Sequence, residues 1–152
     1  MRYANQTVVS VERSKAEIEH LLQRYGASEF AHGWKTDKAV IQFRMMERIV
    51  RFVLPLPDKA EFAKTPRGRR TRNDADTLKA WEQGCRQRWR ALALSIKSKL
   101  ESAESGIEEF ETAFMGQIVM PDGKTISETV TPMIESAYKT GKMPVALLEY
   151  GT

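Results

Sequence analysis

The chain has 152 residues, of which 41% are hydrophobic and 29% charged, as is ordinary for a globular protein. This length suffices for one hydrophobic core, so we expect a single domain over residues 1–152. The composition argues against wholesale disorder. No apolar run approaches the about 20 residues that cross a bilayer, and the N-terminus lacks the core of a signal peptide. We therefore expect a cytoplasmic protein with no membrane partner.

The net charge of +4 is modest, but it is unevenly distributed. Residues 64–99 contain eleven Lys or Arg and three acids, a local excess of +8, which leaves −4 for the rest of the chain. Residues 101–111 contain five glutamates and no base. This division predicts a basic face that attracts a polyanion and an acidic face that points elsewhere. The alternative is that both faces are simply solvated and balance each other's charge, with no binding role.

A first helix is predicted over residues 15–25, where five apolar residues share one side. Ser14 and Glu17 have the spacing of a capping box, which places the helix start at Ser14. Gly26 suits the C-terminal cap, because glycine tolerates the left-handed conformation used there. The helix is therefore expected to end at Tyr25.

Three strand patterns follow, at residues 28–35, 39–45 and 48–54. The second pattern alternates apolar residues with others, which is the period of a half-buried strand. Its expected buried set is Ala39, Ile41, Phe43 and Met45. A tight turn near Met46 and Glu47 would make the sheet an antiparallel meander with one exposed face, which suits Arg44 and Arg51.

A long helix is predicted from Asn73 or Asp74 to about Gly106, where glycine permits a bend. Its apolar residues recur at steps of three or four and form one stripe of about eight turns. The stripe consists of Leu78, Trp81, Cys85, Trp89, Leu92, Ile96, Leu100 and Ala103. Because a helix of this length outreaches a sheet of seven-residue strands, we expect uncovered stripe, and a homodimer is its simplest cover.

The C-terminal third suggests smaller elements. The spacing of apolar residues predicts a second, acidic helix through 107–114, and the turn residues at 121–123 predict a small hairpin between 117–120 and 124–126. A further helix is expected to start at Thr131 and Pro132 and to end at Gly141, with Ile134, Ala137 and Tyr138 packed. The apolar tail 143–150 is expected to dock on the body. The predicted fold is therefore α+β: a three-stranded antiparallel meander packed by a long helix, with additional helices and a small hairpin.

Catalytic chemistry finds little support in the sequence. His20 and His32 are the only histidines, and they match no metal-ligand spacing. Cys85 lies on the packing stripe, so we expect it in the core. It is the single cysteine, which excludes an intrachain disulfide. Lys124 and Thr125 resemble the end of a phosphate loop, but the required first glycine is absent. Asp58, Glu61 and Lys64 have the wrong spacing for a restriction-type nuclease. We expect a binding protein rather than an enzyme, with no cofactor and no metal.

Residues 58–72 have no sustained period and predict an exposed basic loop. Nucleic-acid binding needs cations along phosphates rather than a fixed spacing, and arginine grips a phosphate with two bonds. The predicted contacts are Arg67, Arg69, Arg70 and Arg72 in the loop, with Lys79, Arg86, Arg90 and Lys97 on the helix flank. Trp81 and Trp89 lie among these cations. Exposed rings there would give the bases of a single strand a surface to stack on, but the helical spacing of both residues favours a place in the core.

Three segments carry a family resemblance: residues 80–92, residues 25–27 and residues 52–57. Together they resemble a family of small uncharacterised phage and prophage proteins, over most of the chain. The resemblance implies a role inside an infected bacterium and transfers no catalytic residue. Two functions fit that setting. One is binding of single-stranded DNA or RNA in replication or recombination; the other is a protein–protein interaction that blocks a host defence factor.

Overall fold

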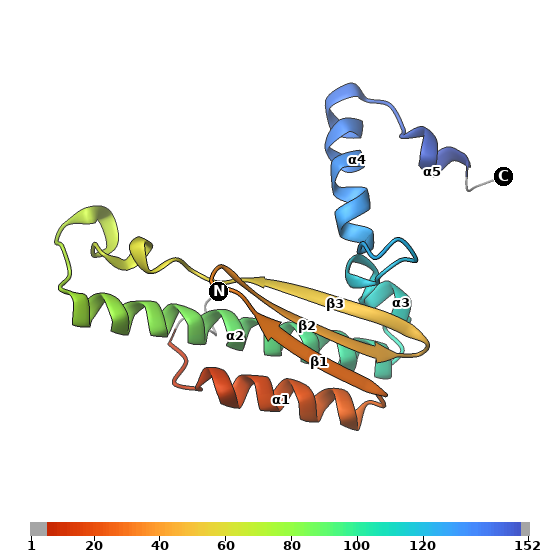
Figure 1. Cartoon of the computed structure of the whole chain (residues 1–152). Helices are drawn as coiled ribbons and strands as arrows, with labels where there is room; N and C mark the ends of the chain where they lie inside the picture. Colours follow the sequence, from red (N-terminus) through yellow and green to blue (C-terminus); the bar gives the residue numbers. More distant parts are fainter. Residues whose placement is uncertain (1–5, 150–152) are drawn as a thin grey trace.

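The computed structural model describes residues 6–149 and has an α+β fold (Figure 1). Residues 1–5 and 150–152 lie outside the described part, so the last residue of the predicted tail, Tyr150, is not described. The elements in chain order are α1 Val11–Arg24, β1 Glu29–Trp34, β2 Lys38–Met45, β3 Arg48–Pro55, η1 Lys59–Phe62, η2 Pro66–Gly68, α2 Asp74–Glu104, α3 Phe110–Ala113, η3 Met115–Gln117, α4 Ile126–Thr140 and α5 Val145–Glu149.

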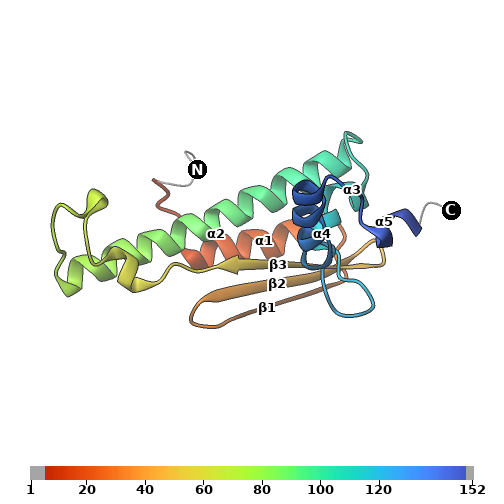
Figure 2. The same cartoon turned by 90° about the horizontal axis from the view of Figure 1, so that it is seen from above.

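The sheet is the predicted antiparallel meander, with strand order β1-β2-β3. α1 and α2 lie side by side and cover the same face of it (Figure 2). Met46 and Glu47 form the tight turn between β2 and β3, and both have positive φ, which matches the twist of a two-residue hairpin. The inner face buries alternate residues: Ala39, Ile41, Phe43 and Met45 of β2, and Val50, Phe52 and Leu54 of β3. Arg44 and Arg51 lie on the opposite face, as predicted.

One hydrophobic core joins the two helices to the sheet. The C-terminal half of α2 contributes Trp89, Leu92, Ile96 and Leu100 to this core. Phe114, which follows α3, is fully buried and lies edge-on to Phe43, with ring centroids 5.8 Å apart. The core therefore reaches from α1 across the sheet to the segment after α2.

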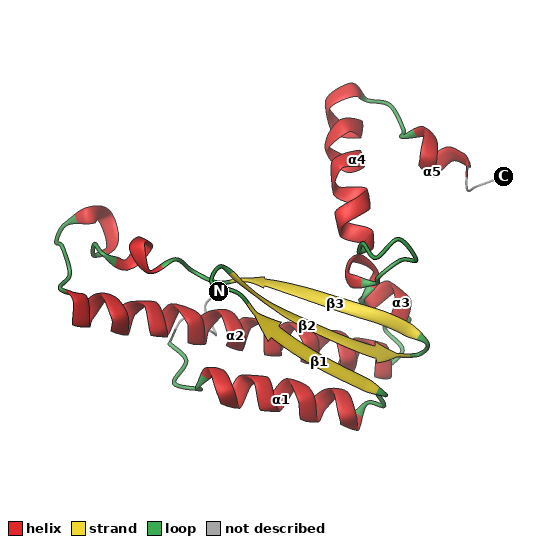
Figure 3. Ribbon diagram, in the orientation of Figure 1, coloured by secondary structure: helices red, strands yellow, loops and turns green. Residues whose placement is uncertain are grey.

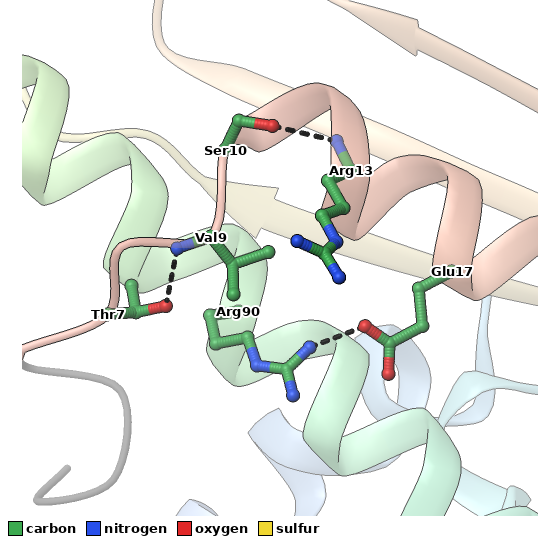
Figure 4. A network of polar contacts seen from close by, with 6 residues as sticks. All are labelled: Thr7, Val9, Ser10, Arg13, Glu17 and Arg90. Atoms are coloured by element: carbon green, nitrogen blue, oxygen red, sulfur yellow. Dashed lines mark hydrogen bonds and ion pairs between the residues drawn. The ribbon is translucent and has the colours of Figure 1, made fainter.

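α1 begins one turn earlier than predicted. Its N-cap is Ser10, whose side chain accepts a hydrogen bond from the Arg13 N–H at 3.1 Å (Figure 4). The predicted cap, Ser14, lies inside the helix, is fully buried, and its Oγ has no hydrogen-bond partner. The capping-box pattern failed because Glu17 pairs with Arg90 of α2 instead of returning to the Ser14 backbone. The predicted end of the helix is confirmed, with Tyr25 as the C-cap and Gly26 at φ +99°.

α2 starts and ends as predicted. The Asn73 side chain accepts a hydrogen bond from the Asp76 N–H at 2.8 Å, and Gly106 follows the helix at φ +77°. The predicted acidic helix through 107–114 is wrong, because only the single turn of α3 is helical there. The predicted small hairpin is confirmed, since Val119 and Thr125 form an antiparallel bridge and the Met120 N–H donates to the Lys124 carbonyl at 2.8 Å. Its first segment also pairs with the edge of the sheet, through a bridge between Ile118 and Val50.

The start predicted at Thr131 and Pro132 for the last long helix is wrong. α4 begins at Ile126 and contains Pro132, because Thr125 and Glu128 form a complete capping box one turn and a half earlier. Its end at Gly141, with φ +69°, is confirmed.

Residues 126–149, the C-terminal arm, project from one end of the sheet (Figure 3). The predicted packing of Ile134 and Tyr138 is wrong, since 51% and 88% of these residues are exposed. The expected docking of the tail is also wrong over its described residues, where Met143 and Val145 are more than half exposed. None of the helices in the described part of the chain is both long and apolar enough to cross a membrane.

Candidate nucleic-acid interface

The basic loop, residues 58–72, is anchored on α2 at its root. Asp58 caps η1 by accepting a hydrogen bond from the Ala60 N–H at 3.1 Å. The Phe62 ring of η1 packs against Gly84 of α2, where a Cβ atom would lie 2.7 Å from the Phe62 Cζ atom. Lys59 of the same turn lies over the Trp81 ring, so the loop covers part of the stripe that extends past the sheet, whereas Leu78 stays 40% exposed. The expected uncovered stripe is therefore present only in part.

The tip of the loop, residues 64–72, is a closed turn rather than an irregular segment. Lys64 and Thr71 form a β-bridge, and the Thr65 N–H donates to the Arg70 carbonyl at 2.8 Å. Arg72 holds this turn, because its guanidinium donates to the Phe62 and Lys64 carbonyls at 3.0 Å and 2.9 Å. Arg72 is therefore engaged within the loop rather than free for a phosphate.

Three predicted contacts, Arg67, Arg69 and Arg70, lie exposed on the tip. Among residues 6–149 their side chains form no hydrogen bond and no ion pair. Arg67 has φ +67°, so the chain reverses sharply here and presents the arginines on a short arc. An arc of unpaired guanidinium groups is a ready set of donors for phosphate oxygens.

The four predicted contacts on α2 divide into two kinds. Lys79 and Lys97 are exposed, and their ammonium groups pair with nothing in the described part of the chain. Arg86 donates from Nε to Gln83 Oε1 at 2.8 Å, and Arg90 forms the ion pair with Glu17 of α1 (Figure 4). Because Lys79 and Lys97 are about 27 Å apart at 1.5 Å per residue, the helix cations form a line rather than one patch.

Both tryptophans, for which the sequence favoured core over stacking on a single strand, are partly or wholly withdrawn from solvent. Trp89 is 3% exposed and belongs to the core, as its spacing favoured. Trp81 is half-buried, and its indole N–H donates to the Pro57 carbonyl at 2.8 Å. The sequence analysis did not identify Lys15 and Lys59, whose ammonium groups each lie 4.9 Å from the centre of one of these rings. No local pattern marks them, because the rings belong to distant segments.

The acidic segment 101–111 lies at the opposite end of α2 from the basic tip (Figure 1). Its ion pair joins Glu111 to Arg48 at 2.8 Å, and Glu108 accepts a hydrogen bond from Ser102. No described contact joins this segment to the tip. The basic loop is therefore not neutralised by the chain's own glutamates.

The two histidines and the single cysteine are the other groups that the sequence offered for chemistry. His20 and His32 are both exposed, and within residues 6–149 no three His, Cys, Asp or Glu side chains gather as a metal site would require. Burial raises the pKa of the Cys85 thiol, opposed by Arg86 and reinforced by Glu82. A raised pKa lowers the thiolate fraction, so Cys85 is a weak nucleophile.

Comparison of the chain with protein-family models, with curated proteins and with solved structures found no match. The chain is therefore classified by its own structure, which is an α+β fold with a basic tip at one end of a long helix.

Proposed function

We propose that this chain binds single-stranded nucleic acid with weak sequence preference, through the tip of the basic loop and the exposed cations of α2. The observation that carries the proposal is the arc of Arg67, Arg69 and Arg70, three exposed guanidinium groups with no partner among the described residues. Unpaired arginines at this density repel one another, and a phosphate backbone relieves that repulsion while releasing its counterions.

The geometry favours a flexible strand over a rigid duplex. The free cations run from the tip to Lys79 and then to Lys97, and a single strand can bend to follow such a line. Contacts to phosphate carry no sequence information, so the preference among sequences should be weak. Either DNA or RNA satisfies this chemistry, in phage replication or recombination as the family resemblance implies.

A second candidate function is supported by a different feature. The C-terminal arm exposes Ile134, Val145 and Leu148, each more than half accessible. An exposed apolar set on a projecting arm is typical of protein–protein contact. This favours, as the alternative, a phage protein that blocks a host defence factor by binding it.

Salt dependence separates the two candidates. Labelled single- and double-stranded oligonucleotides are titrated at two salt concentrations, beside a pull-down from infected cells. If the five free cations, from the three of the tip to Lys79 and Lys97, each neutralise one phosphate of a single strand, the slope of log affinity against log salt should be about −3.5. Replacing Arg67, Arg69 and Arg70 with Gln should flatten that slope by about 2.

The matched control replaces three other exposed cations with Gln, all of which lie away from the tip: Arg24, Lys124 and Lys142. This variant has the same net charge as the loop variant, so a slope that falls equally in both would mean that only net charge matters. Absence of salt-dependent binding, together with one stoichiometric protein partner, would contradict the proposal and favour the defence-blocking role.

A further inference from the structure

All three tryptophans of the chain line one cleft, with a volume of about 770 Å³. It opens between the start of α1, the turn from β1 to β2, the segment after β3 and the middle of α2. Trp34, Trp81 and Trp89 form its aromatic walls, and Cys85 is also part of the lining. Trp34 ends β1 and the other three residues lie on α2, so only the fold brings the two segments together.

Trp34 is the unusual member of this set. It lies opposite Ala39 in the register of β1 and β2, and directly paired residues point to the same face of a sheet. Ala39 is 1% exposed on the inner face, whereas Trp34 is 74% exposed. A large aromatic ring is therefore presented on the face of the sheet that the helices cover, at a place where they leave it open.

The charges around the cleft indicate which ligand fits. Lys15 and Lys59 place ammonium groups over the rings of Trp89 and Trp81, so the positions that a cationic guest would occupy are already filled. Arg86 and Lys35 also line the cleft. The cleft acids Glu12, Asp37, Asp58 and Glu82 balance these four cations, and Asp58 is engaged as the cap of η1. A flat ring bearing an anionic group suits this arrangement, because it can stack on Trp34 and bring its anion to the ammonium groups.

The cleft adjoins the root of the basic loop. The Trp81 indole N–H donates a hydrogen bond to the Pro57 carbonyl, and Lys59 belongs to η1, the first turn of that loop. A strand held by the arginines of the tip could therefore deliver a base to the cleft along the loop. We propose that the tryptophan cleft binds one unpaired nucleotide, its base stacked on Trp34 and its phosphate near Lys15 and Lys59. This inference rests on the proposed function and assigns it a base-binding site.

The test compares two strands of equal length and charge, a thymidine oligonucleotide and the same phosphodiester backbone without bases. Because every tryptophan lines the cleft, tryptophan fluorescence, excited selectively over that of the four tyrosines, reports on this site. We expect the thymidine strand to bind about tenfold more tightly than the base-free strand, and to quench fluorescence that the base-free strand leaves unchanged. Thymidine monophosphate alone, at higher concentration, should quench as well.

Trp34→Ala should bring the two strands to equal affinity, and Trp34→Phe should restore part of the difference. Trp34 is largely exposed, so both variants should fold, which circular dichroism checks. Tyr138→Ala is the matched control, an exposed aromatic residue on α4 outside the cleft, and it should change nothing.

Each failure has its own signature. Salt-dependent binding of both strands with equal affinity, and no quenching by thymidine monophosphate, would overturn the cleft and leave the proposed function intact. Binding of neither strand would overturn the proposed function; the cleft would then stand only if thymidine monophosphate quenches and Trp34→Ala abolishes the quenching.

Discussion

The two halves of α2 have the same apolar period but different surroundings. In the C-terminal half, Trp89, Ile96 and Leu100 are at most 3% exposed beneath the sheet and beside α1. In the N-terminal half, Leu78 is 40% exposed, and Trp81 is half-buried against Pro57 and Lys59. The difference shows that a helical period identifies the face that can pack, whereas the cover over that face depends on elements far along the chain.

The largest contrast should come from removing one leucine from each half. Leu92→Ala should cost about 2–5 kcal/mol of unfolding free energy, because Leu92 is 8% exposed within the core. Leu78→Ala should cost no more than about 1 kcal/mol, because much of that side chain is already in water. Denaturant unfolding of both variants measures the difference. Equal losses would mean that the N-terminal half is packed as tightly as the other.

A smaller effect is expected on the packed side, at Ser14 of α1. Its hydroxyl is fully buried without a partner, so Ser14→Ala should raise the unfolding free energy by about 1 kcal/mol. Ser98→Ala on the exposed side of α2 is the control, since it gains helix propensity without relieving a buried hydroxyl. A destabilised Ser14→Ala variant would show that the hydroxyl is hydrogen-bonded in solution.

The predicted homodimer can be tested by mass. The sequence argument placed its interface on the stripe of α2, but Lys59 of η1 lies over Trp81 of that stripe, and the larger exposed apolar set lies on the C-terminal arm. If two copies cover each other's arms, light scattering should give twice 17.3 kDa, and removal of residues 143–149 should favour the monomer. A particle of 17.3 kDa at all concentrations would contradict the dimer.

The smallest predicted effect concerns Cys85, in the less covered half of α2. Because burial raises the pKa of this thiol, alkylation at pH 8 should be slower in the folded chain than in the unfolded chain. The gap should close as pH rises through the folded pKa. Because the thiol pKa is higher in the folded chain than in the unfolded chain, the protonated thiol stabilises the fold fully at pH values below the unfolded pKa. This contribution to stability is lost as pH rises through the folded pKa. Equal alkylation rates at pH 8 would contradict the raised pKa.

The sheet and the limits of α2 could be predicted because their signals are local. Alternation along β2 directly reflects its one buried face, and Asn73 and Gly106 mark the helix ends by their own backbone preferences. Competing local signals explain the errors. Ser10 and Ser14 are both plausible caps, and the capping box at Thr125 outweighs the proline at 132.

The candidate site was predicted only in part, because pairing partners lie far apart in sequence. The exposure of Arg67, Arg69 and Arg70 followed from composition alone. That Arg90 is held by Glu17, 73 residues away, depends on how α1 packs against α2. Likewise, Trp34 was assigned only to a strand, and no spacing connects it to Trp81, which reaches the same cleft from another element.

The separation of basic tip and acidic segment along α2 makes the molecule an elongated electric dipole. In the field of any polyanion such a body experiences a torque, which turns the tip forward and the glutamates back before contact. Orientation during approach raises the fraction of productive encounters, and added salt shortens the range over which it acts. The arrangement of charge at the two ends of one helix thus governs the speed of association as well as its strength.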